Sequence, residues 1–372
     1  GADGDGGLGE RVDFAVNPGF AHPPRAAQDP VHPRQQPCLH SHAHAQSPFW
    51  RARLDAAGID PAKVADISVL SRLPPLRRPE IQAQFEAMRA RPPGWSEDDI
   101  TLHTTSGSTG QPVLMEKLQV LYATIYQAVT LMDHRWHRRD SRRLLASFTH
   151  KVKDTDTGRW GQPMLWYERV GRAFGRNSKD RSTAELYRAL QDKRPAYLNT
   201  GPTLLRGIAE AARDIPGPAP RIEQFITSTE RVDHDLRRLV REVFGGRITD
   251  RYSSEECGWL ALQCPKHDHY HAMSAVNHLE VVDDAGQPCR PGEPGRVLVT
   301  SLHSYAMPLL RYEIGDMAEL GEHCDCGITL PVIARIRGRI RDVVILPNGQ
   351  RQFVNLNLGG KIAGTEVLEH QT

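Results

Sequence analysis

From residue 143 to residue 257 the sequence alternates between two kinds of segment. Short apolar runs such as LLASF and IEQFITST are typical of buried strands, whereas TAELYRALQ and DHDLRRLVREVF have the apolar spacing of amphipathic helices. This alternation predicts a mixed or parallel sheet covered by helices, which is an α/β fold. Ligands of such sheets bind in the loops that follow the carboxyl ends of the strands, so we expect a functional site in loops of that kind.

Composition narrows the class of protein further. The chain has 372 residues, of which 25% are charged and 39% apolar, with a formal net charge of +2. The length suggests about two or three domains, and the near-neutral charge gives no reason to expect nucleic acid or an anionic membrane as a partner. No apolar run is long enough for a transmembrane helix, and the N-terminus lacks the pattern of a secretory signal. Six cysteines in a chain of this length do not predict a disulfide framework. We therefore expect a cytoplasmic protein.

Three parts are expected along the chain. Residues 1–46 are rich in Pro, His and Gly, which predicts an irregular N-terminal segment. Residues 47–337 would form the core, and from about residue 279 a β-rich texture with Gly and Pro turns predicts a small β subdomain within it. Residues 338–372 begin with a predicted hairpin and are too few to fold independently.

A loop of small residues separates two predicted strands near residue 105. Six consecutive residues, Thr105 to Gly110 (TSGSTG), carry no apolar side chain. One explanation is a turn, although a hairpin needs only about two residues. The other is a phosphate cradle, because exposed N–H groups and hydroxyls bind anions. Gln111 follows Gly110, so the lysine of the GxxxxGK[ST] motif is absent and a P-loop phosphotransferase is disfavoured.

Three further stretches follow this loop in order: DRYSSEECG at 250–258, RYEIGD at 311–316 and GRIRD at 338–342. With TTSGSTG, they resemble the ordered motifs of the adenylate-forming superfamily of acyl-CoA synthetases, nonribosomal adenylation domains and luciferases. SPFWRARLDAAGI, LSRLPPLRRPEI and HCDCG are similar to the phenylacetate–CoA ligase branch of that superfamily. The resemblance spans roughly residues 47–371, almost the whole chain.

The resemblance implies a particular fold. It is the large N-terminal domain of the superfamily, with helix-covered mixed β-sheets and a small β-barrel subdomain. The small C-terminal lid domain would be largely absent, because the chain stops where most of it should begin. Arg341 would occupy the hinge position, and Lys361 lies too early to match the lysine of the lid that assists adenylation.

The resemblance also assigns residues to the phosphates and the metal. The phosphate-binding loop would consist of Thr105, Ser106, Gly107, Ser108, Thr109 and Gly110. Thr105, Thr109 and Glu256 would be catalytic, and Glu256 would ligate Mg²⁺, a hard cation that prefers oxygen ligands. Tyr252 would lie near the adenine, and Ser253 replaces the glycine that usually follows this tyrosine. Cofactors implied are ATP and Mg²⁺, with CoA as the usual acceptor.

Further nucleotide contacts are implied by the later motifs. Asp316 would hold the ribose hydroxyls, since a carboxylate can accept two hydrogen bonds from a diol, and Arg339 would contact the ribose or a phosphate. Three weaker candidates lie where the superfamily contacts adenine: Ser228, Thr229 and Glu230. Glu255 stands where a hydroxyl residue usually contacts the α-phosphate, so that contact would be lost and Glu255 is an alternative metal ligand to Glu256.

The implied activity has two steps. A carboxylic acid reacts with ATP to give an acyl-adenylate and pyrophosphate, and CoA or another nucleophile then takes the acyl group. Two alternatives stay open: an enzyme that joins the activated acid to an amine in a biosynthetic pathway, and a non-catalytic nucleotide-binding relative. A homodimer is also among the expected assemblies.

Two more groups of residues attract attention. Cys264, His271, Cys324 and Cys326 are enough ligands for a closed, structural zinc site; His267 and His269 are rival ligands, and the alternative is reduced cysteines beside a histidine-rich loop. The aromatic residues of the predicted acid pocket are Trp160, Trp166, Tyr167 and Tyr197, which would favour an aryl or arylacetic acid or would belong to the core. His150 and Lys151 are candidates for meeting the carboxylate of the acid.

Overall fold

A computed structural model describes residues 35–64, 66–91, 94–105, 112–161 and 171–340, together with four short strands beyond residue 340. Loop Ser106–Gln111 and residues 162–170 lie outside the described residues, and so do Trp166 and Tyr167. Among the helices that are described, none combines the length and the apolar character that a membrane span requires.

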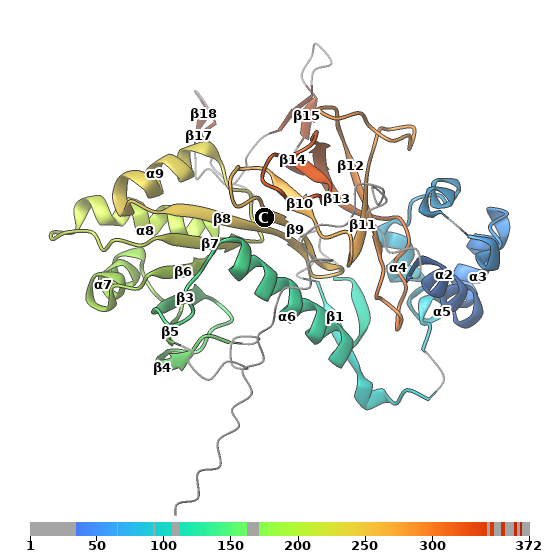
Figure 1. Ribbon diagram of the computed structural model, residues 1–372, viewed down its shortest axis with the longest axis horizontal. Coiled ribbons are helices and arrows are strands. Elements are labelled where there is room, and N and C mark those ends of the chain that lie inside the picture. Colours follow the sequence, from blue (N-terminus) through green and yellow to red (C-terminus); the bar gives the residue numbers. More distant parts are fainter. Residues whose placement is uncertain are drawn as a thin grey trace, which may run out of the picture.

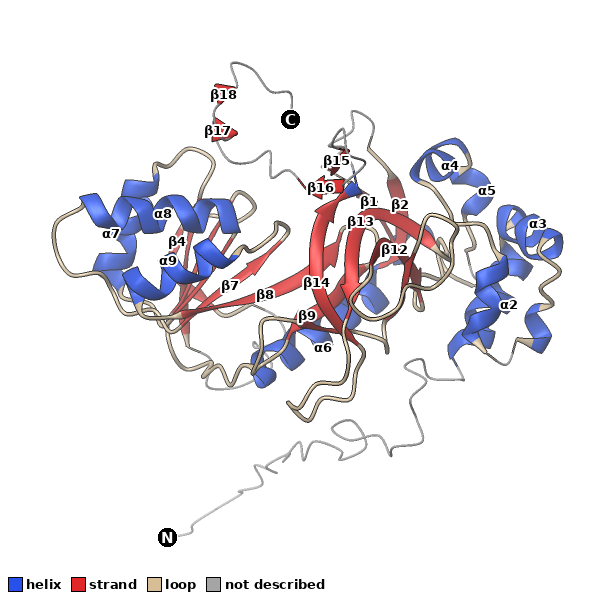
Figure 2. Cartoon of the chain, turned by 90° about the horizontal axis from the view of Figure 1, so that it is seen from above, coloured by secondary structure: helices blue, strands red, loops and turns tan. Residues whose placement is uncertain are grey.

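A group of short helices forms one end of the molecule (Figures 1 and 2). Its members are α2 (Gln35–Gln46), α3 (Pro48–Ala56), η1 (Pro61–Lys63), η2 (Ile67–Arg72), α4 (Arg78–Ala83) and α5 (Phe85–Met88). The Ser47 hydroxyl caps α3 by accepting from the Trp50 N–H at 3.3 Å. The expectation of an irregular segment up to residue 46 was wrong for residues 35–46. Leu39 and Ala43, one turn apart on α2, are fully buried, and this packing stabilises a helix that its composition does not favour.

Next along the chain come η3 (Glu97–Asp99) and an antiparallel pair of strands, β1 (Ile100–Thr104) and β2 (Leu114–Leu118). The pair flanks the glycine-rich loop, as predicted. The long helix α6 (Gln119–Trp136) follows β2 directly.

The remaining described strands up to residue 340 form one twelve-stranded mixed sheet in the order β11-β12-β13-β14-β10-β9-β8-β7-β6-β3-β5-β4. Its first half contains β3 (Leu145–Thr149), β4 (Thr155–Arg159), β5 (Arg172–Asn177), β6 (Tyr197–Thr200), β7 (Gln224–Ser228) and β8 (Arg247–Ser254). All neighbours in this half pair in parallel except β4 and β5. The intervening helices are α7 (Thr183–Lys193), α8 (Pro202–Asp214) and α9 (His234–Phe244). This is the α/β alternation that the sequence predicts.

Both faces of the parallel half are covered, because successive residues of a strand point to opposite faces. On β6, Leu198 packs in a cluster with α7, α8 and α9, whereas its neighbour Tyr197 packs on the other side with Leu131 of α6. Figure 1 shows the three helices on one side of the strands and α6 on the other.

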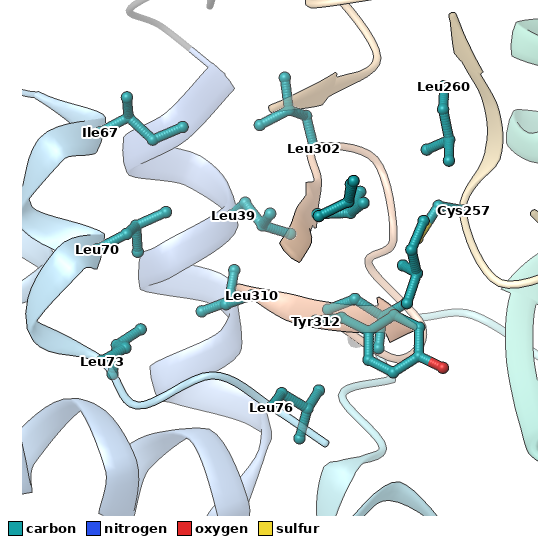
Figure 3. Close-up of a cluster of buried hydrophobic side chains, with 14 of the residues drawn as sticks. Leu39, Ile67, Leu70, Leu73, Leu76, Cys257, Leu260, Leu302, Leu310 and Tyr312 are labelled. Atoms are coloured by element: carbon teal, nitrogen blue, oxygen red, sulfur yellow. The ribbon is translucent and has the colours of Figure 1, made fainter. Parts of the chain in front are cut away.

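The antiparallel half contains β9 (Gly258–Gln263), β10 (Tyr270–Ala272), β11 (Asn277–Val282), β12 (Pro294–Ser301), β13 (Tyr312–Leu320) and β14 (Val332–Arg339). The predicted β-rich region from residue 279 is therefore real, and pairing of β14 with β10 joins it to the main sheet. The largest hydrophobic cluster lies between these strands and the N-terminal helices. Figure 3 shows Leu39, Leu70 and Leu73 of the helical side facing Leu310 and Tyr312 of the strand side.

Beyond Ile340 the chain forms the predicted hairpin. Strands β15 (Val343–Ile345) and β16 (Arg351–Phe353) pair antiparallel. A second small pair consists of β17 (Lys361–Ile362) and β18 (Thr365–Glu366). Arg341 lies outside the described residues.

Candidate active site

Three of the sequence motifs meet at Tyr252, near the end of β8. Tyr252 is buried, and its hydroxyl donates to Asp316 Oδ2 at 2.8 Å. Asp316 on β13 is the register partner of Arg339 on β14, and Arg339 Nε lies 3.0 Å from Asp316 Oδ1. Residues predicted to hold adenine and ribose are thus joined in one group, which we call the Tyr252 cluster.

The environment of this cluster suits a polar ligand. Burial and the neighbouring Asp316 carboxylate raise the pKa of Tyr252 well above its usual value, so its hydroxyl remains a donor at neutral pH. The Arg339 side chain is 47% exposed, and its guanidinium also donates to the Ile314 carbonyl at 3.0 Å. A carboxylate backed by a donor on one side and a solvent-accessible cation on the other can accept hydrogen bonds from hydroxyl groups of a ligand.

A second group, around Glu256, lies at the turn between β8 and β9. The Tyr312 hydroxyl donates to Glu256 Oε1 at 3.1 Å, and Arg78 Nη1 lies 3.7 Å from the same oxygen. Arg78 Nη2 also donates to Thr105 Oγ1 at 2.7 Å. One guanidinium therefore connects the predicted magnesium ligand to the residue at which the glycine-rich loop begins.

Of that loop, only Thr105 can be placed. It is buried, and its hydroxyl also accepts from the Val113 N–H at 2.9 Å, which fixes the base of the loop. Ser106, Gly107, Ser108, Thr109 and Gly110 lie outside the described residues, so their phosphate role stays a prediction.

The two adjacent glutamates have different surroundings. Glu255 is half exposed, and its carboxylate pairs with Lys151 Nζ at 3.1 Å, so Lys151 meets a carboxylate of the protein itself. Glu256 is buried and carries the contacts to Arg78 and Tyr312. Of the two, Glu256 is the one connected through Arg78 to the base of the loop. Ser253 lies between the two groups in the chain, on β8 opposite Trp259.

The weaker adenine candidates follow β7, the neighbour of β8. Ser228 is the register partner of Arg251, and Thr229 has a positive φ of 75°. Glu230 Oε2 accepts from the Thr203 N–H at 3.0 Å, at the N-terminus of α8, where a carboxylate is favourable. Glu230 therefore has a structural role as a helix cap, and its nucleotide role stays a prediction.

A small cleft adjoins Glu256. Its walls come from β2, α6, the β8–β9 turn and residues 301–304. Tyr122, Tyr126 and Trp259 form an aromatic side, in which the rings of Tyr126 and Trp259 stack with centroids 4.7 Å apart. Gly258 has φ +72°, and a Cβ there would contact the Tyr122 ring at 3.4 Å, so this glycine keeps the turn close to the cleft.

Two of the expected acid-pocket aromatics lie within the described residues, and both lie elsewhere. Trp160 and Tyr197 are buried in the core, edge-to-face at 5.5 Å, and the indole N–H of Trp160 donates to the Arg143 carbonyl at 2.9 Å. The core alternative is therefore correct for both residues. The sequence did not single out Tyr122 or Tyr126, because helix α6 has an ordinary amphipathic pattern. It did not single out Trp259, because GWLALQ indicates only a strand.

The cleft also contains a lysine that the sequence did not single out. Lys117 on β2 is 5% exposed, donates to the Glu255 carbonyl at 2.5 Å, and lies 3.8 Å from the centre of the Tyr122 ring. Burial lowers the pKa of Lys117 to about 8, against the opposing effect of nearby Cys257, Glu255 and Glu256. The sequence LMEKL indicates only a strand, so no signal identified Lys117 in advance.

The four predicted zinc ligands come together at the junction of β9, β10 and the β13–β14 loop. The ligand atoms of Cys264, His271, Cys324 and Cys326 all lie within 4.8 Å of one another. Cys326 Sγ is 3.3 Å from His271 Nε2, whereas His271 Nδ1 lies 3.2 Å from the Leu330 carbonyl. In this orientation Nε2 points toward the sulfur atoms and Nδ1 toward a carbonyl, as in metal-binding histidines.

The rival ligands are also close. His269 Nε2 is 3.1 Å from Cys324 Sγ. His267 instead contacts Asp325, at 2.5 Å, and belongs to a second group with Cys324. The donor set fits Zn²⁺, since thiolate and imidazole are its preferred ligands.

The fold and the site together define an enzyme of the adenylate-forming class. A model of the family described as "AMP-binding enzyme" matches residues 39–305, more than half of the chain. The chain therefore belongs to this family and is an AMP-forming carboxylate ligase.

Similar proteins include two curated phenylacetate–coenzyme A ligases. The one from Thermus thermophilus is 26% identical over 320 residues, which cover 83% of this chain and 69% of that protein. The one from Escherichia coli K12 is 23% identical over 319 residues, 82% of this chain and 69% of that protein.

Solved structures confirm the fold. A 2-hydroxyisobutyryl-CoA ligase with 2-HIB-AMP and CoA in the thioesterification state has a TM-score of 0.69 at 20% identity, covering 89% of this chain and 73% of that one. The open conformation of that ligase has a TM-score of 0.66 at 19% identity, covering 86% of this chain and 76% of that one. The predicted fold class is thus correct.

Proposed function

We propose that this chain uses ATP to activate an aromatic or arylacetic acid and transfers the acyl group to CoA. The proposal depends mainly on one observation: the aromatic-walled cleft lies directly beside Glu256, and Tyr252 of the Tyr252 cluster is on β8, the strand that leads into the Glu256 turn. The names of the phenylacetate–coenzyme A ligases support both the arylacetic acid and CoA.

The reaction has two balanced steps. A carboxylate oxygen of the acid attacks the α-phosphorus of ATP, the bond from that phosphorus to the bridging oxygen breaks, and pyrophosphate leaves. The CoA thiolate then attacks the acyl carbon, the bond between this carbon and the phosphate oxygen breaks, and AMP leaves. Because no covalent bond to the protein is needed, its residues act by positioning and by electrostatics.

We assign the residues of this chain as follows. Asp316 accepts hydrogen bonds from the ribose hydroxyls, Tyr252 donates to Asp316 and borders the adenine, and Arg339 contacts the ribose or a phosphate. Glu256 holds Mg²⁺, which would neutralise charge on the phosphates. Arg78, already directed at both Glu256 and Thr105, is placed to meet the phosphates of ATP.

An amine acceptor and a non-catalytic nucleotide-binding role are the alternative functions. A single experiment addresses the proposal: acid-dependent ATP–pyrophosphate exchange with benzoic, arylacetic and fatty acids, with and without Mg²⁺. We expect exchange with aromatic acids that requires Mg²⁺. Nucleotide binding without exchange for any acid would favour the non-catalytic role, and exchange without thioester formation would favour an amine acceptor.

We further propose that Cys264, His271, Cys324 and Cys326 hold a structural Zn²⁺. A closed site with four protein ligands has no open position for chemistry, so it would tie the β13–β14 loop to β9 and β10. Metal analysis of the purified chain should give about one equivalent of zinc, and less than about 0.2 equivalents would contradict the site. Cys326→Ser should lower the zinc content, whereas the remote Cys289→Ser should not.

A further inference from the structure

The cleft beside Glu256 contains a buried cation. Lys117 is the penultimate residue of β2, and it lines the cleft together with Tyr122, Tyr126 and Trp259. Long charged side chains usually extend to solvent, yet Lys117 is only 5% exposed. A lysine in this position destabilises the fold, because removal of an ammonium from water costs free energy unless an anion compensates for it.

Burial lowers the pKa of Lys117, and the nearby Glu255 and Glu256, which raise it, do not outweigh that effect. Lys117 Nζ donates to the Glu255 carbonyl and lies over the Tyr122 ring, and both are neutral groups. Within the part of the chain that the structure describes, no carboxylate forms an ion pair with Lys117. Three glutamates close to Lys117 in the chain or in the cleft are paired with other cations: Glu116 with Arg89 and Arg91, Glu255 with Lys151, and Glu256 with Arg78.

The neighbouring contacts also hold the ammonium in place. The Glu255 carbonyl fixes Nζ from the β8–β9 turn, and the Tyr122 ring fixes it from α6. The cation is thus positioned before a ligand arrives, which lowers the entropic cost of a new hydrogen bond. The rest of the lining is mainly apolar or aromatic, which strengthens any interaction with an anionic oxygen in the cleft.

We propose that Lys117 selects the substrate by binding a second anionic oxygen on it. The preferred acid would be aromatic, with one carboxylate activated beside Glu256 and a second carboxylate or a phenolate received by Lys117. This inference rests on the proposed function, and it narrows the substrate class from aromatic acids to aromatic acids with a second acidic group.

The test uses stable analogues of the acyl-adenylate, N-acyl-sulfamoyl adenosines, so that binding is measured without turnover. Three acyl groups are compared by calorimetry: benzoyl, hydroxybenzoyl and carboxybenzoyl, the last two as ring-position isomers. The wild type should bind at least one acidic isomer roughly 10- to 100-fold more tightly than the benzoyl analogue, as expected for a hydrogen bond to a charged group. Whichever acidic analogue binds best distinguishes the phenolate from the carboxylate.

Three variants complete the test. Lys117→Met should remove the preference while binding of the benzoyl analogue stays equal or improves. Lys117→Arg, which keeps the charge, should retain part of the preference. Lys63→Met changes a lysine whose side chain is 84% exposed and should leave every affinity unchanged.

Each contrary result has a distinct meaning. Equal loss for all three analogues in Lys117→Met would place Lys117 at the shared acyl-phosphate group and overturn the inference. Absence of any preference in the wild type would overturn it too, while tight benzoyl binding left the proposed function intact. Failure of all analogues to bind would overturn both. If Lys117→Met does not fold, the wild-type preference and Lys117→Arg still decide the question.

Discussion

Two adjacent residues of β8, Arg251 and Tyr252, belong to two very different acid–arginine groups. Arg251 Nε donates to Asp133 Oδ2 at 2.8 Å, and Arg139 donates to the same oxygen at 2.5 Å. The side chains of Asp133 and Arg139 are 0% exposed. Tyr252 instead joins Asp316 and Arg339, and the Arg339 side chain is 47% exposed.

The two groups differ in solvent access, and this difference distinguishes a structural group, around Asp133, from a candidate binding site, around Tyr252. Burial alone would raise the pKa of Asp133, but Arg251 and Arg139 outweigh it and hold that pKa well below its usual range. The Asp133 carboxylate is closed to solvent and already paired with two arginines of the protein itself. In the Tyr252 cluster, water reaches Arg339, so its contact with Asp316 can be exchanged for contacts to a nucleotide at little cost.

The largest predicted loss of stability comes from a substitution that breaks the buried group around Asp133. Asp133→Ala leaves two arginines buried without their carboxylate, which should lower the free energy of unfolding by about 3–5 kcal/mol. Denaturant titration followed by circular dichroism measures this loss. A decrease below about 1 kcal/mol would show that the buried group is not what holds α6 to β8.

The second prediction concerns how the stability of the same buried group depends on pH. Burial and the nearby Arg251 and Arg139 lower the pKa of His134 to about 3, and burial lowers that of His137 to about 3 against the attraction of Asp133. The unfolded chain therefore takes up these protons first, and stability is lost as the pH falls from about 6.5 to about 3.

Each histidine should contribute up to about 1.4 kcal/mol per pH unit in that window. Unfolding measured between pH 6 and pH 4 should show this loss of stability, and His137→Gln should reduce the slope by up to about 1.4 kcal/mol per pH unit. An unchanged slope in that variant would assign the acid sensitivity to other groups.

The third prediction tests the solvent-accessible Tyr252 cluster. Asp316→Ala removes the acceptor of hydrogen bonds from the ribose hydroxyls and should weaken ATP binding roughly 10-fold or more. It also leaves the buried Tyr252 hydroxyl without its acceptor, which should lower the free energy of unfolding by about 1–3 kcal/mol. Calorimetric titration of ATP with Mg²⁺ gives the affinity, and Asp192→Ala, at an exposed position of α7, is the matched control. Unchanged ATP affinity would count against the ribose assignment.

The two groups also differ in how well the sequence predicted them. Tyr252, Asp316 and Arg339 were predicted because they stand in ordered motifs, and β13 and β14 bring the last two into register. Arg78 and Lys117 were missed because they lie in segments that indicate only a helix and a strand. Tertiary packing brings both residues close to Glu256, and the local sequence pattern contains no information about that packing.

Burial explains the other differences. Helix α2 was missed because its composition is unfavourable and its stability comes from Leu39 and Ala43 in the core. Trp160 and Tyr197 are near the expected pocket in sequence, but they point to the α6 face of the sheet. Strand and helix alternation, in contrast, is a local property, so the α/β architecture was predictable.

The most direct test of acyl-adenylate formation is to trace the carboxylate oxygen atoms of the acid into the products. An aromatic acid labelled with ¹⁸O in its carboxylate is incubated with the chain, ATP, Mg²⁺ and hydroxylamine, which traps the activated acyl group, and the released AMP is analysed by mass spectrometry. Attack of the carboxylate on the α-phosphorus predicts AMP that carries one ¹⁸O atom. Unlabelled AMP, or ADP as the nucleotide product, would contradict the proposal that this site forms an acyl-adenylate.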